Sequence, residues 1–183
     1  MRIIAGKAKG RKLETIEGID TRPTLDRVKE AMFGSLQFEI PGASVLDLFA
    51  GSGALSLEAA SRGAFSVIAN DLNPLCVRVI KKNISVTRLE DIVTVLNLDY
   101  KVCIDRLKAE GKTFKIVFID APYSEDFGPD ALERLAESNL ILLDGYVVFE
   151  HARERQLLDT FGSLHLLKTK FFGSCAFSIY QRY

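Results

Sequence analysis

The apolar positions of the chain switch regularly between two spacings from residue 43 onward. Five short apolar runs are typical of strands buried on both faces: 44–49, 66–70, 92–96, 114–119 and 146–150. Four stretches between them have helical spacing: 54–61, 74–86, 101–110 and 130–138. Pro74 stands at the first turn of its helix, which is a position that proline favours. Strands and helices in alternation predict a parallel sheet with helices on both faces.

The two ends of the chain depart from this pattern. Residues 2–5 and 11–14 flank a Gly/Lys turn and predict a small β-hairpin, followed by a helix that Thr24 caps. Residues 164–171 and 175–182 predict an antiparallel pair of strands. The predicted fold class is therefore α/β: a doubly wound, mostly parallel seven-stranded sheet with an antiparallel C-terminal hairpin. Residues 1–40 are predicted to form an N-terminal hairpin and helix extension, and residues 41–183 the main domain.

Composition places the chain among ordinary globular proteins. It has 183 residues, of which 48% are hydrophobic and 26% charged, enough for one core. There is no apolar run of about 18 residues and no signal-peptide pattern at the N-terminus, so we expect no membrane partner and a cytoplasmic location. Three widely spaced cysteines without a Cys-x-x-Cys pair predict neither disulfides nor a metal site.

Charge is neutral in sum but uneven along the chain. The first twelve residues contain five basic residues and no acidic one: Arg2, Lys7, Lys9, Arg11 and Lys12. Such a basic arm is compatible with contact to phosphates, although a solvated tail explains the charge equally well.

A glycine-containing loop follows the first buried strand, where open α/β sheets bind their ligands. The segment from Asp47 to Gly53 has Gly-x-Gly but carries Ser56 where a dinucleotide loop needs its third glycine. The Gly-Lys-Ser/Thr of a Walker loop is also missing. An acidic strand end without a phosphate cradle favours a cationic cofactor that lacks pyrophosphate, and S-adenosylmethionine has that chemistry.

Acidic residues follow the first three strands of this series. Asp47 can bind an ammonium group or organise the loop, Asp71 can hold a ribose diol, and Asp99 can reach an adenine amine. A single aspartate at a strand end is more often a helix cap, but three together with the glycine loop favour a cofactor site. The predicted cofactor-binding residues are Asp47, Phe49, Ala50, Gly51, Ser52, Gly53, Asp71, Leu72 and Asp99.

The fourth strand ends in Asp120-Ala121-Pro122-Tyr123. A carboxylate, two carbonyls beside a rigid proline and an aromatic ring suit a flat substrate that carries an amine. Asp120 and the carbonyl of Ala121 can each accept a hydrogen bond from that amine, and Tyr123 offers a stacking face. The alternative is an ordinary turn, since aspartate and proline are common turn residues. The loop at residues 47–53 favours the catalytic interpretation of residues 120–123.

With these motifs, the chain resembles the bacterial 16S ribosomal RNA guanine-N2 methyltransferase family over its whole length. The resemblance rests on the N-terminal segments 1–7, 10–13, 21–24 and 26–31, together with 47–55 and 120–123. It implies a Rossmann-like class I methyltransferase that uses S-adenosylmethionine, acts as a monomer and modifies rRNA in a small-subunit assembly particle. It also implies RNA contacts by Arg2, Lys7, Lys9, Arg11, Lys12, Arg22, Pro23, Thr24 and Arg27.

Two departures from the family pattern affect the expected site. Ala121 replaces the first proline of the usual Asp-Pro-Pro-Tyr turn, and Asn70-Asp71 replaces a single glutamate after the second strand. Two other functions stay open: methylation of another amine, either adenine N6 or a protein glutamine, and a catalytically silent RNA-binding assembly factor.

Overall fold

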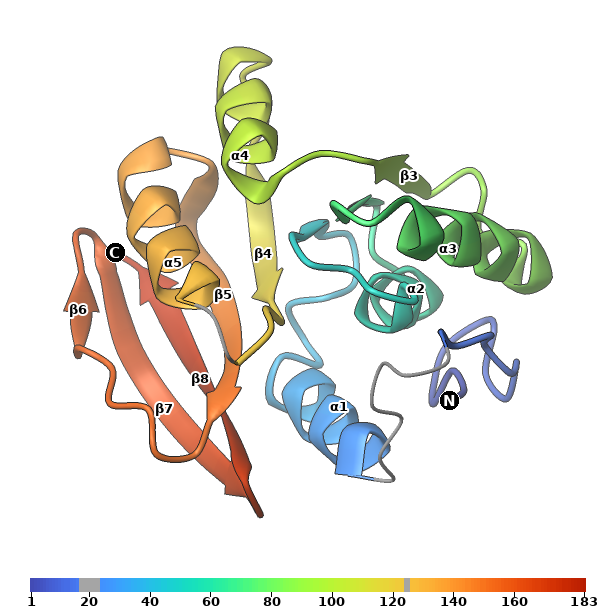
Figure 1. Cartoon of the computed structure of the whole chain (residues 1–183), viewed down its shortest axis with the longest axis horizontal. Helices are drawn as coiled ribbons and strands as arrows, with labels where there is room; N and C mark the ends of the chain where they lie inside the picture. Colours follow the sequence, from blue (N-terminus) through green and yellow to red (C-terminus); the bar gives the residue numbers. More distant parts are fainter. Residues whose placement is uncertain (17–23, 124–125) are drawn as a thin grey trace.

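The structure is a computed structural model that describes residues 1–16, 24–123 and 126–183; the side chains of Thr24 and Leu25 lie outside that description. The elements in chain order are α1 (Thr24–Ser35), β1 (Ser44–Asp47), α2 (Ala54–Ser61), β2 (Ser66–Asn70), α3 (Pro74–Thr87), β3 (Val93–Leu96), α4 (Tyr100–Ala109), β4 (Phe114–Ile119), α5 (Phe127–Ser138), β5 (Ile141–Ala152), β6 (Thr160–Phe161), β7 (Leu164–Phe172) and β8 (Cys175–Arg182). The strands form an eight-stranded sheet in the order β3-β2-β1-β4-β5-β8-β7-β6 (Figure 1).

This topology confirms the predicted α/β class. The strands β1 to β5 pair in parallel, whereas β8 runs antiparallel to both β5 and β7. The predicted number of seven strands was wrong, because Thr160 and Phe161 pair with the start of β7 and add an eighth strand. A strand of two residues is too short to leave a periodic pattern in the sequence.

The largest differences from the predicted strand boundaries are in β1 and β5. β1 ends at Asp47, two residues earlier than expected, so that the cofactor loop begins at Leu48. β5 begins at Ile141 and continues through Asp144, whose φ is 58°, before the register with β4 shifts. The polar Asp144-Gly145 pair resembles a turn in the sequence, which explains why only the second part of β5 was predicted.

The helices cover both faces of the sheet and bury two hydrophobic clusters. α1, α2 and α3 contribute Phe33, Leu57 and Ile80 to one cluster. α4 and α5 contribute Ile104 and Leu135 to the other. No helix in the described ranges is both long and apolar enough to cross a membrane.

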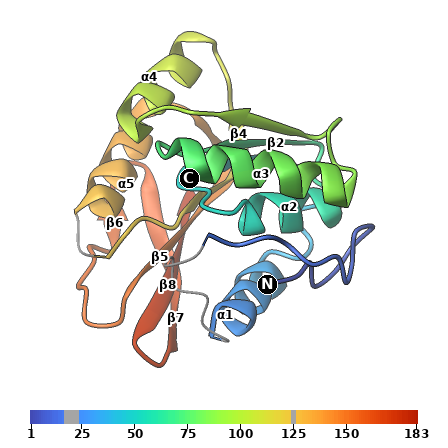
Figure 2. The same ribbon diagram turned by 45° about the vertical axis from the view of Figure 1, so that its right-hand side comes forward.

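The N-terminal segment 1–16, which we call the basic arm, lies beside α1 and α2 in both views (Figure 1 and Figure 2). The predicted hairpin is present over a short length. The antiparallel bridge between Arg2 and Lys12 is flanked by hydrogen bonds from the Ile3 N–H to the Arg11 carbonyl and from the Leu13 N–H to the Met1 carbonyl, at 3.0 and 3.1 Å. Ile3 is fully buried in the same cluster as α1 and α2. Gly6 has a φ of +84°, and a Cβ there would lie 1.8 Å from the carbonyl oxygen of Ser61. The short hairpin is therefore docked against α2 by close backbone contact at Gly6. The division at residue 40 stays a prediction.

Candidate active site

The predicted cofactor loop connects β1 to α2. Gly51 and Gly53 both have left-handed φ angles, +57° and +82°, which explains why glycine stands at both positions. A Cβ on Gly51 would meet no atom within 4 Å, so this side of the loop is open. A Cβ on Gly53 would lie 3.3 Å from Ile80, because α3 packs closely there. The loop thus has an open side at Gly51 and a packed side at Gly53.

Asp71, directly after β2, holds this loop in place. Its Oδ2 accepts a hydrogen bond from the Gly51 N–H at 2.8 Å, and its Oδ1 accepts one from the Asn73 N–H, also at 2.8 Å. The structure therefore brings Asp71 to the glycine loop, as the prediction requires for a shared site. Leu72, the neighbouring predicted residue, is 65% exposed.

Asn70 was not predicted as a site residue, yet it joins three segments of the site. Its Nδ2 donates to the carbonyl oxygens of Leu48 and Leu98, at 3.1 and 3.0 Å, and its Oδ1 accepts from the Leu98 N–H. The side chain is 1% exposed. Its only signal in the sequence is a polar amide at the last position of a buried strand.

Asp99 lies after β3 as the N-cap of α4 and accepts a hydrogen bond from the Lys101 N–H at 2.8 Å. Next to it, the ring of Tyr100 contacts the rings of Phe49 and Phe127, with centroids 5.2 and 5.6 Å apart. The Tyr100 hydroxyl donates to Asp130. Phe49, a predicted cofactor residue, is thus part of an aromatic row that links the loop to α5.

Asp47 organises the start of α2. Its Oδ2 accepts hydrogen bonds from the backbone N–H and the hydroxyl of Ser56, at 3.0 and 2.6 Å. Its Oδ1 is buried and has no hydrogen-bond partner among the described residues. Burial raises the pKa of Asp47 to about 7, and the charge of Asp71 adds to the increase. Asp47 was predicted either to bind an ammonium group or to organise the loop, and its hydrogen bonds with Ser56 show the second role.

These features fit a cationic cofactor. A positive group near Asp47 would favour its charged form, which burial otherwise disfavours. S-adenosylmethionine carries an ammonium and a sulfonium, and Gly51 leaves open space for it beside Asp71.

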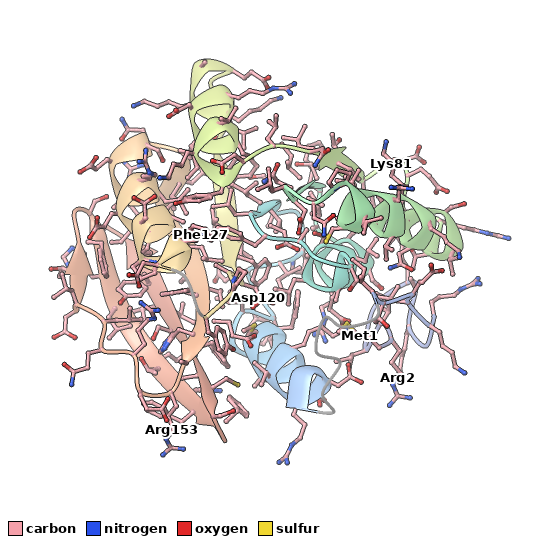
Figure 3. The ribbon with its side chains drawn as sticks, viewed as in Figure 1. Met1, Arg2, Lys81, Asp120, Phe127 and Arg153 are labelled. Carbon is pink, nitrogen blue, oxygen red and sulfur yellow. The ribbon has the colours of Figure 1, made fainter. Side chains whose placement is uncertain are left out.

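The predicted catalytic turn follows β4 on the same edge of the sheet, and Figure 3 labels Asp120 there. No hydrogen bond from a described residue reaches the Asp120 carboxylate. Burial, followed by the charges of Glu150 and Asp47, raises the pKa of Asp120 well above its ordinary value. Residues 121–123 line a small pocket that also includes Phe149 and Glu150.

Glu150, near the end of β5, is a site residue that was not predicted. Its Oε1 accepts a hydrogen bond of 2.6 Å from the Tyr123 hydroxyl. Glu150 is only 7% exposed, and burial raises its pKa. Tyr123 itself is 40% exposed, so its hydroxyl is anchored while part of the ring stays accessible. An acidic residue at the end of another buried strand was the signal that could have identified Glu150.

His151 follows Glu150 but is a structural residue. Its Nε2 lies 3.0 Å from the Ser178 hydroxyl and its Nδ1 lies 2.9 Å from the Ala152 carbonyl. Burial lowers its pKa. Both ring nitrogens are engaged within the sheet, which is the arrangement expected of a structural histidine.

The basic arm is anchored through α2 and exposes its charges. The Glu58 carboxylate accepts hydrogen bonds from the Ile4 and Ala5 N–H groups at 2.8 and 3.0 Å. Ser61 accepts from the Ala8 N–H and donates to the Ala5 carbonyl. The predicted RNA-binding residues that are exposed are Arg2, Lys7, Lys9, Arg11, Lys12 and Arg27. Arg22, Pro23 and the side chain of Thr24 lie outside the described residues.

Comparisons with known proteins identify the family and the relatives of this chain. The family described as conserved hypothetical protein 95 matches residues 1–181. A Bacillus subtilis relative named "Putative rRNA methyltransferase YlbH" is 34% identical over 182 residues, covering 100% of this chain and 99% of that protein. The Escherichia coli protein named "Ribosomal RNA small subunit methyltransferase D" is 31% identical over 182 residues, covering 100% of this chain and 90% of its own length.

Solved structures give the same result for the fold. The structure described as "Putative methyltransferase yhhF from Escherichia coli" has a TM-score of 0.86 at 31% identity, covering 100% of this chain and 97% of that chain. A protein described as SMU.776, "a putative methyltransferase complexed with SAH", shares the fold at a TM-score of 0.64 and 16% identity, covering 84% of this chain and 49% of that chain. The predicted Rossmann-like methyltransferase fold is confirmed.

Proposed function

Because this chain belongs to the conserved hypothetical protein 95 family, we propose that it transfers a methyl group from S-adenosylmethionine to the exocyclic N2 amine of a guanine in 16S rRNA. The observation that carries this proposal is the Asp120 carboxylate. It lies at the carboxyl end of β4, near Asp47 of the cofactor loop, and no described residue donates a hydrogen bond to it. An acceptor in this position is available for an incoming amine.

The cofactor half of the site consists of the loop 47–53 with Asp71 and Asp99. Asp71 positions the backbone of Gly51, and the open side of that glycine leaves room for a nucleoside. Asp47 contributes negative charge on the side where a cation would lie. S-adenosylmethionine, when bound, supplies an electrophilic methyl group on a positive sulfur. Relatives named rRNA methyltransferases and the SAH complex of a protein with this fold support this cofactor.

The substrate amine needs help because its lone pair is delocalised into the base. Asp120 can accept a hydrogen bond from one N–H of the amine, and the Ala121 carbonyl can accept one from the other. Two acceptors around the nitrogen orient its lone pair toward the methyl donor and favour the tetrahedral geometry that develops. The raised pKa of Asp120 makes it a better recipient for the proton that the amine loses.

Carboxylate chemistry favours guanine over adenine. The Watson–Crick edge of guanine presents the N2 amine beside an N1–H donor, whereas adenine presents its amine beside an acceptor. Asp120 and Glu150 are both acceptors when ionised, and the charge of Glu150 contributes to the raised pKa of Asp120. Tyr123 offers part of its ring for stacking on a base that has left its helix.

We propose RNA contact for the exposed side chains of the basic arm. Residues 2–12 contain five basic residues and no acidic one. Phosphate contacts by such residues position a substrate without reading its sequence. Because the arm carries only a few charges, phosphate contacts would supply only part of the RNA-binding free energy. Recognition of the shape of a folded small-subunit particle would supply the remainder.

The test is methyl transfer to small ribosomal subunits from a strain that lacks the endogenous activity. The protein is incubated with methyl-labelled S-adenosylmethionine, and the RNA is digested to nucleosides. We expect label in N2-methylguanosine. Asp120→Asn should abolish the label, whereas Asp105→Asn, the same change at an exposed position of α4, should not alter it.

Other outcomes would contradict the proposal in distinct ways. Label in N6-methyladenosine or in protein would assign a different amine substrate. Cofactor binding without any label would also reject the guanine, and a protein that binds RNA but no cofactor would be a silent assembly factor. The silent assembly factor is considered because Ala121 departs from the family's usual Asp-Pro-Pro-Tyr turn.

A further inference from the structure

Asn83 on α3 connects two parts of the molecule that are far apart in the sequence. Its Oδ1 accepts a hydrogen bond from the Glu14 N–H at 2.8 Å, and its Nδ2 donates to the Glu14 carbonyl at 2.9 Å. The same Nδ2 donates to the carbonyl of Ser52 at 2.9 Å. The side chain is 1% exposed. One buried amide thus contacts both the basic arm and the cofactor loop.

On the arm side, Asn83 provides one of several anchors, and Lys29 of α1 provides another by donating to the Arg2 carbonyl at 2.7 Å. Glu58 and Ser61 hold residues 4–8 against α2, while Asn83 holds residue 14 against α3. Lys7, Lys9, Arg11 and Lys12 lie between or beside these anchors and are exposed. The position of the arm's charges therefore depends on all three helices.

On the loop side, the backbone of two adjacent residues, Gly51 and Ser52, is held from two directions. Asp71 accepts the Gly51 N–H, and Asn83 donates to the Ser52 carbonyl. The loop runs directly into α2, whose Glu58 is an anchor of the arm. A shift of the arm therefore acts on the loop both through Asn83 and through α2.

We propose that Asn83 is a positioning residue that couples RNA contact on the basic arm to cofactor binding in the loop 47–53. This inference rests on the proposed function, because it needs both ligands. RNA bound to the arm fixes Glu14 against Asn83, which fixes the Ser52 peptide and so the loop that receives the cofactor. By linkage, bound cofactor strengthens RNA binding by the same factor.

The test measures binding without chemistry. Labelled S-adenosylhomocysteine, which has no methyl group to transfer, is equilibrated by dialysis with the full chain, alone and with unmethylated small subunits. The ratio of the two dissociation constants is the coupling factor. We expect a factor of about fivefold or more in the wild type. Asn83→Ala should bring it close to one, and so should Asn83→Asp, which keeps the acceptor for Glu14 but loses both donated bonds.

A matched control separates coupling from stability. Thr87→Val on the same helix also loses buried hydrogen bonds, but these go to the carbonyls of Asn83 and Ile84 within α3. It should lower the melting temperature and keep the coupling factor. The proposal is overturned if the wild-type factor is one although both ligands bind, or if Asn83→Asp keeps the wild-type factor. Failure of the wild type to bind one of the ligands would instead reject the proposed function.

Discussion

The carboxylates at the carboxyl ends of β1, β2 and β3 are tied to backbone N–H groups, whereas those at the carboxyl ends of β4 and β5 are not. Asp47 accepts from Ser56, Asp71 from Gly51 and Asn73, and Asp99 from Lys101. In the second group, Glu150 accepts from a tyrosine hydroxyl, and Asp120 has no hydrogen-bond donor among the described residues. We call these groups the cofactor half and the catalytic half.

This difference separates two tasks at one edge of a sheet. In the cofactor half, the carboxylates build the loop before any ligand arrives, so binding needs little rearrangement. In the catalytic half, the proposed function keeps acceptor capacity for the substrate, and burial without backbone donors raises the pKa values of Asp120 and Glu150. Variants of the two halves should therefore fail in different ways.

The largest effect is expected for Asp120→Asn. Losing the charged acceptor should lower kcat by about 100- to 1000-fold, as for other groups that stabilise developing charge. The dissociation constant of S-adenosylmethionine should change by less than about twofold, because Asp120 holds no part of the loop. Single-turnover kinetics and calorimetry measure the two quantities. Turnover at the wild-type rate would remove Asp120 from the chemistry.

Asp71→Ala should show the opposite pattern. It removes two charge-assisted hydrogen bonds that position Gly51 and Asn73. Hydrogen bonds of this kind contribute about 1.5–3 kcal/mol each, so we expect cofactor affinity to fall by about 10- to 100-fold. At saturating cofactor, the methyl-transfer rate should recover. A rate that stays low at saturation would mean that Asp71 also acts in the catalytic half.

Glu150→Gln tests the electrostatics of the catalytic half. The ionised form of Asp120 accepts the amine's hydrogen bond, so activity falls as pH drops through its raised pKa. Removing the neighbouring charge of Glu150 lowers that pKa, and the acid limb of the profile of kcat/KM should move to lower pH. Glutamine still offers an oxygen to the Tyr123 hydroxyl. An acid limb that stays in place or moves to higher pH would contradict the assignment.

The smallest effect is expected for Ala121→Pro, which restores the Asp-Pro-Pro-Tyr turn of the methyltransferase family that the sequence resembles. Ala121 is 4% exposed, and the proposed mechanism uses only its carbonyl oxygen. We expect kcat to change by less than about threefold, because the carbonyl is retained and only backbone rigidity is added. Steady-state assays on the same particles are sufficient. A rise of tenfold or more would show that rigidity at this position limits the wild-type enzyme.

Much of the fold could be predicted because its signals are local. β2 and β4 were predicted with their observed boundaries, since each is a continuous apolar run between turn residues. The docking of the N-terminal hairpin against α2 was not predicted. The residues that anchor it, Glu58 and Ser61, lie more than 50 residues away in the sequence. Periodicity carries no information about such contacts.

The site was predictable where chemistry and position coincide. Asp71, Gly51 and Asp120 stand at strand ends, where α/β sheets bind their ligands, and the structure places Asp71 against Gly51. Asn70, Asn83 and Glu150 were missed because a buried amide or carboxylate has no distinctive spacing. Their partners, in other strands and in the basic arm, become visible only once the chain is folded.

The most direct test of the central claim compares Asp71→Ala and Asp120→Asn in one experiment, with cofactor affinity and single-turnover rate measured on the same preparations. The division into two halves predicts a crossed result: weakened cofactor binding with a normal rate at saturation for Asp71→Ala, and normal binding with a collapsed rate for Asp120→Asn. If both variants lose affinity and rate in the same proportion, the two groups of carboxylates do not perform separate tasks.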